Sequence, residues 1–124
     1  QLTERLPESE SVFTDLGEEA PSCSYWRRYC GEMVEAVRYV LDRDKLALVV
    51  TQPYRSERHR EQQTLLSAFL REQFKGAANL HFANLGPTLN VFDPEMAGDS
   101  LHLTPLGNRL LAQHLVGRIR TLFQ

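Results

Sequence analysis

The feature that most constrains the fold is a continuous apolar run at residues 46–50, which read Leu-Ala-Leu-Val-Val. An apolar run with β-branched residues and no polar alternation predicts a strand buried on both faces, as in a parallel sheet. We expect the strand to end at Thr51-Gln52-Pro53-Tyr54, because proline lacks the N–H that a sheet ladder needs.

Helical periodicity surrounds this strand. Residues 24–42 are expected to form a helix with Ser24 as a candidate N-cap, and residues 56–75 a second helix that stops at Gly76. The apolar stripes expected to face the core are Tyr29, Met33, Val37 and Val40/Leu41 in the first helix, and Leu65, Leu66, Phe69 and Leu70 in the second.

A second short strand is expected at residues 80–85, ended by Gly86-Pro87. The last helix has clear start signals, since Thr104 is a good N-cap and Pro105 suits the first helical position. Its apolar stripe runs to the C-terminus through Leu106, Leu110, Leu115, Ile119 and Leu122. The order helix, strand, helix, strand, helix predicts an α/β layer fold with a parallel sheet.

Two buried strands would leave an apolar sheet edge that needs partners. The chain also opens at Gln1 without a methionine, so we expect a partial polypeptide. The expected organisation is an acidic loop or tail at residues 1–23, followed at residues 24–124 by the C-terminal part of a single larger domain.

Composition excludes several classes of function. A net charge of −2 gives no electrostatic case for binding nucleic acid, and no apolar run is long enough for a transmembrane segment. Cys23 and Cys30 form no metal-ligand pattern. We expect free thiols, because seven residues along one helix separate two cysteines by about 10 Å; a disulfide is open only if Cys23 lies before the helix.

The residues with the clearest chemistry are Asp99 and His102, which stand three apart directly before the last helix. In a turn, this spacing can bring the carboxylate to one ring nitrogen and fix the imidazole tautomer. The other ring nitrogen is then free to take a proton from a serine. The pair predicts an orienting acid, Asp99, and a general base, His102.

The stretch at residues 99–108, Asp-Ser-Leu-His-Leu-Thr-Pro-Leu-Gly-Asn, closely resembles the last conserved block of the SGNH (GDSL) hydrolases. The resemblance extends more loosely back to about residue 24. It implies a three-layer α/β/α fold of the SGNH, flavodoxin-like type, of which only the C-terminal part is present. It also implies a Ser/His/Asp esterase or lipase that needs no metal or cofactor, with Asp99 as the acid and His102 as the base.

The nucleophile half of that family's site has no counterpart here. Residues 98–101 spell Gly-Asp-Ser-Leu, the letters of the family's first block, but they follow no apolar strand. A nucleophile needs a sharp strand-to-helix turn and nearby oxyanion donors, so Ser100 is interpreted as a bystander. We expect the nucleophile and oxyanion residues to lie on a missing or separate N-terminal part of the same domain.

Other side chains give weaker signals. Gln52 and Tyr54 follow the first strand, where ligands of open α/β sheets bind, so both are candidate substrate-binding residues; exposed side chains of a turn are the alternative. Tyr25 and Trp26 are interpreted as packing residues, with the lining of an acyl groove as the alternative. His59, His81 and His114 make no ligand set, and we interpret His59 and His114 as surface residues.

The predicted function is hydrolysis of a small-molecule, lipid or carbohydrate ester through an acyl-enzyme. Two alternatives stay open: a non-catalytic module that keeps the SGNH-like scaffold, and an acyltransferase acting on a sugar or alcohol. The ester, the cellular compartment and the oligomeric state do not follow from the sequence.

Overall fold

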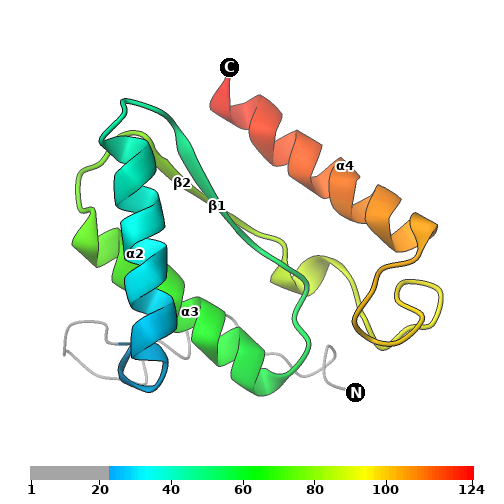
Figure 1. Ribbon diagram of the computed structural model, residues 1–124. Coiled ribbons are helices and arrows are strands. Elements are labelled where there is room, and N and C mark those ends of the chain that lie inside the picture. The colour runs from blue at the N-terminus through cyan, green and yellow to red at the C-terminus, as the bar shows by residue number, and fades with distance from the viewer. Residues whose placement is uncertain (1–22) are drawn as a thin grey trace. The chain divides into compact units, whose positions relative to one another are not determined.

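The computed structural model describes residues 23–124, so the expected acidic segment lies outside the described residues except for Cys23. Helices and strands alternate along the chain in the predicted order (Figure 1). Two short 3-10 helices, η2 and η3, add to them. The elements are η2 (Ser24–Trp26), α2 (Arg27–Leu41), β1 (Ala47–Thr51), α3 (Glu57–Gln73), β2 (Leu80–Asn84), η3 (Gly86–Thr88) and α4 (Pro105–Leu122).

The two strands pair with each other in a parallel sheet, which confirms an α/β architecture. At the start of the pair, the N–H of Ala47 donates to the carbonyl of Asn79 at 2.8 Å. At its end, the N–H of Leu85 donates to the carbonyl of Thr51 at 3.0 Å. Both strands therefore finish at the same edge, where Pro53 prevents β1 from continuing.

The described residues fall into two compact units. Residues 23–49 and 60–82 form the first, which we call the α2–α3 unit. Residues 50–59 and 83–124 form the second, which we call the α4 unit. β1, β2 and α3 each begin in one unit and end in the other.

The core of the α2–α3 unit is a single cluster of buried residues: Cys23, Cys30, Val34, Val37, Leu65, Leu66 and Leu70. The predicted stripe of α3 is confirmed, because its three leucines are buried and Phe69 packs against them. The predicted stripe of α2 is only partly right. Tyr29 is exposed and Met33 is half-buried, whereas Cys30 and Val34 face the core.

The buried face of α2 is thus rotated from the predicted one, and a disulfide between Cys23 and Cys30 explains the rotation. The disulfide also corrects the expectation of free thiols. Cys23 precedes α2, and the 3-10 turn of η2 brings its Cα within 6.2 Å of the Cα of Cys30. Both cysteines are buried in the core cluster. The expected cap is also wrong: Ser24 lies inside η2, and Trp26 occupies the N-cap position of α2 without a side-chain hydrogen bond.

The two aromatic residues at the start of α2 have different environments. Trp26 packs against the core cluster as expected, but Tyr25 is 80% exposed, so its interpretation as a packing residue is wrong. At the far end of α3, the chain turns at Gly76, whose φ of 84° lies in the left-handed region. This confirms the predicted stop signal.

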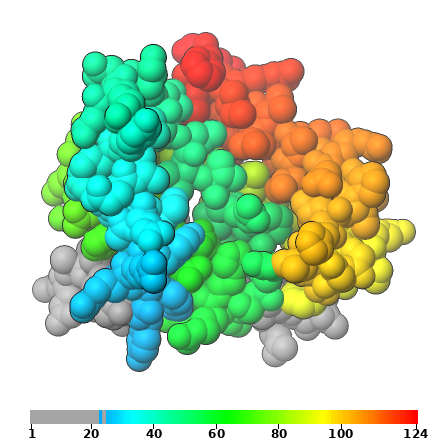
Figure 2. All heavy atoms as spheres, in the orientation of Figure 1, coloured from blue at the N-terminus to red at the C-terminus, as the bar shows by residue number. Residues whose placement is uncertain are grey.

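α4 has its predicted start but only part of its predicted burial. Within the described residues, it buries only Gly107, and Leu106, Val116 and Ile119 are exposed. Figure 2 shows atoms of α4, in orange and red, on the viewed face. Of the predicted stripe, Leu106 and Ile119 are therefore exposed, whereas Leu110, Leu115 and Leu122 are half-buried. No described helix is long and apolar enough to cross a membrane.

Candidate active site

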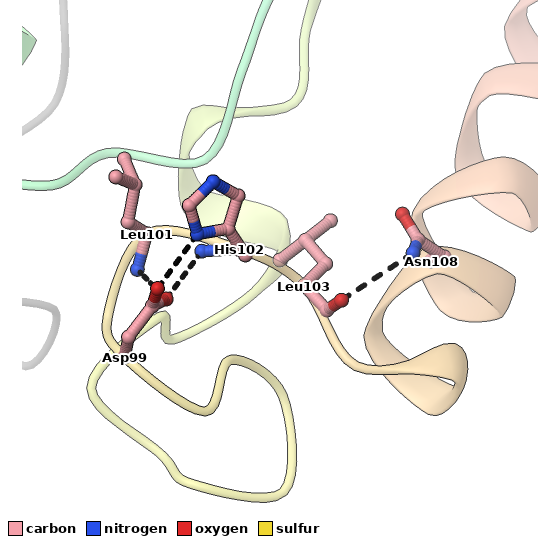
Figure 3. Close-up of polar contacts among 5 residues, drawn as sticks. All are labelled: Asp99, Leu101, His102, Leu103 and Asn108. Carbon is pink, nitrogen blue, oxygen red and sulfur yellow. Dashed lines mark hydrogen bonds and ion pairs between the residues drawn. The ribbon is translucent and has the colours of Figure 1, made fainter.

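Asp99 and His102 meet in the turn that precedes α4 (Figure 3). One carboxylate oxygen, Oδ2, lies 2.6 Å from Nδ1 of the His102 ring. The other, Oδ1, accepts the backbone N–H groups of Leu101 at 2.9 Å and His102 at 2.6 Å. Ser100 adopts a left-handed φ of 61°, which bends the chain back over the carboxylate. A single carboxylate thus shapes the turn and orients the ring.

These contacts fix the charge of Asp99. The backbone N–H of His102 is the main group that lowers the pKa of Asp99, followed by the ring hydrogen bond and then the N–H of Leu101. Asp99 is therefore an ionised carboxylate at neutral pH, which can only accept hydrogen bonds. In the neutral form of the imidazole, this carboxylate favours the tautomer with the ring proton on Nδ1, in which Nε2 is an acceptor.

The pair is open to solvent, since the His102 side chain is 80% exposed and that of Asp99 is 55% exposed. An accessible Nε2 on an oriented imidazole can take a proton from a hydroxyl group brought to it by another segment. The predicted residues are thus together, in the geometry that an acid–base pair requires.

Thr104 anchors this turn to α4. Its side-chain oxygen accepts the N–H of Gly107 at 3.1 Å, which confirms the predicted N-cap. The same hydroxyl lies 2.5 Å from the carbonyl of Glu95 and 3.2 Å from that of Met96. The backbone N–H of Thr104 also donates to Met96, at 2.8 Å. The start of the helix and the loop before Asp99 are therefore one hydrogen-bonded unit.

Gly107 allows the loop to approach the helix this closely. A Cβ atom at this position would collide with the carbonyl oxygen of Met96. A β-bridge between Ala97 and Leu103 closes the base of the loop, and the side-chain amide of Asn108 donates to the carbonyl of Leu103 at 3.5 Å (Figure 3). Sequence reasoning gave Gly107 no role; a glycine three residues after a cap was the available signal.

The path into the loop is set by two further side chains that sequence reasoning missed. Asn90 Oδ1 accepts the N–H of Phe92, and Asp93 Oδ1 accepts the N–H of Glu95, each at 2.9 Å. Asparagine and aspartate often bend the chain by accepting an N–H two residues ahead. Their positions among other turn-forming residues were the sequence signal that could have predicted these bends.

The two candidate substrate-binding residues have different environments. Gln52 is exposed, whereas Tyr54 is 3% exposed. The ring of Tyr54 lies against Gly86, where a Cβ atom would overlap it, and its hydroxyl donates to Asn84 Oδ1 at 3.2 Å. Tyr54 therefore packs the ends of the two strands together, which rules out the alternative of an exposed turn side chain. A substrate role for either residue stays a prediction.

His59 is not the surface residue that was expected. It is half-buried, its ring packs edge-on against Tyr54, and its Nδ1 accepts the N–H of Arg55 at 3.2 Å. Burial lowers the pKa of His59, and the charge of Arg55 lowers it further. His59 is therefore held neutral as part of the packing. His114 is exposed as predicted.

No group of three or more His, Cys, Asp or Glu side chains within residues 23–124 is arranged to hold a metal ion. Comparison with protein-family models, with curated proteins and with solved structures finds no match to the chain. Interpretation of the site therefore rests on its own geometry.

Proposed function

We propose that this chain contributes the acid and base of a serine ester hydrolase, and that the nucleophilic serine and the oxyanion donors come from another segment or chain. The observation that carries the proposal is the contact of 2.6 Å between Asp99 Oδ2 and His102 Nδ1, which leaves an exposed Nε2. A carboxylate that fixes the imidazole in this tautomer is the arrangement that serine hydrolases use.

The chemistry follows from the proton positions. Nε2 of His102 takes the proton of the serine hydroxyl as its oxygen attacks the ester carbonyl, and Asp99 stabilises the resulting imidazolium. The imidazolium then gives its proton to the oxygen of the leaving alcohol, and an acyl-enzyme remains. Water, activated by the same nitrogen, hydrolyses the acyl-enzyme and releases the acid.

The incomplete sheet supports the need for a further protein part. In the described residues the sheet has two strands, and half-buried Leu48, Val49 and Val50 lie on β1. Leu106 and Ile119 of the apolar stripe of α4 are also exposed. Additional strands beside β1 would complete a three-layer α/β/α domain of the SGNH type, which the Asp99–His102 block resembles.

A serine-directed fluorophosphonate tests the proposal. It is expected to label the intact assembly on a serine outside this chain and to leave the isolated chain unlabelled. Labelling of the isolated chain at Ser100 would instead make Ser100 the nucleophile and contradict the proposed division of the triad.

Substitution then separates catalysis from binding. In the intact, unlabelled assembly, His102→Ala is expected to abolish ester turnover, and Asp99→Asn to lower kcat by about 10⁴-fold because the amide favours the wrong tautomer. His114→Ala, a change at an exposed histidine on α4, is the matched control and should retain full activity. Turnover that survives in His102→Ala, or is absent from the wild type, would indicate a non-catalytic module.

A further inference from the structure

Leu101 presents an apolar side chain directly beside the proposed base. It is 49% exposed, although its backbone N–H is held at 2.9 Å by Asp99 Oδ1, the oxygen that also holds the N–H of His102. Figure 3 shows the Leu101 side chain and the His102 ring rising from the same side of the loop. The carboxylate that orients the imidazole therefore also fixes the backbone from which the leucine projects.

The half of the ester that meets this leucine follows from the reaction. The Nε2 atom takes a proton from the nucleophile and returns it to the leaving oxygen, so the alcohol half of the ester must lie beside the imidazole. The acyl half is instead directed by the nucleophile and the oxyanion donors, which this chain does not supply. A side chain flanking the ring is consequently placed to contact the alcohol.

We propose that Leu101 determines specificity for the alcohol half of the substrate and selects esters of alkyl or aryl alcohols over esters of sugars. This inference rests on the proposed function. An apolar group buries methylene groups favourably, but it offers no hydrogen bond to the hydroxyls of a sugar, which would lose water on binding. Asp99 accepts the backbone N–H of Leu101, so the side chain projects from a fixed point of the loop.

The experiment uses the intact assembly and two ester series. The first series keeps the acetyl group and lengthens the alcohol from ethyl to hexyl, and the second keeps the ethyl group and lengthens the acid from acetate to hexanoate. Leu101→Ala is expected to lower kcat/KM for hexyl acetate about five- to tenfold relative to ethyl acetate, because apolar contact is lost. Leu101→Met should largely restore the preference, and the dependence on acid length should be retained.

Phe123→Ala, a truncation of an exposed aromatic residue beyond the end of α4, is the matched control and should change neither series. A shift in the acid series, or an unchanged alcohol series in Leu101→Ala, would overturn the inference. If hydrolysis also survives in His102→Ala, the proposed function fails together with it. Loss of activity in His102→Ala with an unchanged alcohol series would refute the inference about Leu101 alone.

Discussion

Different interactions stabilise the interior of each of the two compact units of this chain. In the α2–α3 unit, seven buried residues form one cluster, and a disulfide closes it at the start of α2. In the α4 unit, the hydroxyl of Thr104 donates a hydrogen bond and the carboxylates of Asp93 and Asp99 accept backbone N–H groups, and these bonds hold the loop; some apolar side chains of α4 stay exposed. The α4 unit also has its own buried apolar residues: Tyr54, Ala83, Leu85, Leu89, Val91 and Ala97. The exposed acid–base pair itself lies in a turn whose geometry is set by polar contacts.

The comparison is tested most strongly by truncating one leucine in each unit. Leu70→Ala is expected to lower the free energy of unfolding by about 2–5 kcal/mol, because Leu70 is fully buried and its removal leaves a cavity. Leu106→Ala should cost well under half as much, since Leu106 is 38% exposed. Urea unfolding followed by circular dichroism measures both values. Equal costs would show that α4 is as well packed as α3.

Removing the disulfide is expected to have the next largest effect. In the double variant Cys23→Ser/Cys30→Ser, the cross-link between two residues seven positions apart is lost. On the chain-entropy model, this loss should lower the free energy of unfolding by about 2–3 kcal/mol. Thermal unfolding of the double variant and of the reduced wild type measures this cost. A double variant as stable as the wild type would show that apolar burial alone maintains the α2–α3 unit.

Two glycines on the same helix test the close contact in the α4 unit. Gly107→Ala should destabilise the chain by about 1–3 kcal/mol and lower ester turnover by the assembly, because the added methyl group displaces Met96 and the loop before Asp99. Gly117→Ala is the control: nothing lies within 4 Å of its Cβ, so it should gain up to about 1 kcal/mol in helix propensity. Similar effects of both substitutions would contradict the importance of the Met96 contact.

The smallest expected effect concerns pH. Folding lowers the pKa of His59 below the ordinary value of 6.5, so the unfolded state binds the proton more readily. The stabilisation is therefore fully present above pH 6.5 and is lost as the pH falls through the lowered pKa. His59→Asn, which keeps an acceptor near Nδ1, should show a smaller drop in Tm between pH 8 and pH 5.5. An unchanged drop would place the sensitivity elsewhere.

Local signals predicted most of the secondary structure. The cap at Thr104, the stop at Gly76 and the apolar run of β1 each depend on neighbours in sequence, and each lies within a residue or two of its predicted place. The spacing of Asp99 and His102 could likewise be interpreted, because their contact forms within one turn.

Contacts between distant segments could not be predicted in this way. The burial of Tyr54 depends on Gly86. The need for glycine at position 107 depends on the close approach of Met96, so neither feature is visible from local sequence. The disulfide was missed for a subtler reason, since a 3-10 turn and a straight helix place Cys23 differently and share the same sequence pattern.

Thr104 joins two properties that are usually treated separately. The terminal turns of a helix fray readily, and the side chain that caps the N-terminus sets how often the first turn opens. Here the cap also ties down the backbone at Glu95 and Met96. Each opening of that first turn thus frees the backbone at Glu95 and Met96, which leads into the turn of Asp99 and His102. The fraction of molecules with an ordered imidazole therefore follows the helix–coil equilibrium at the N-terminal end of α4.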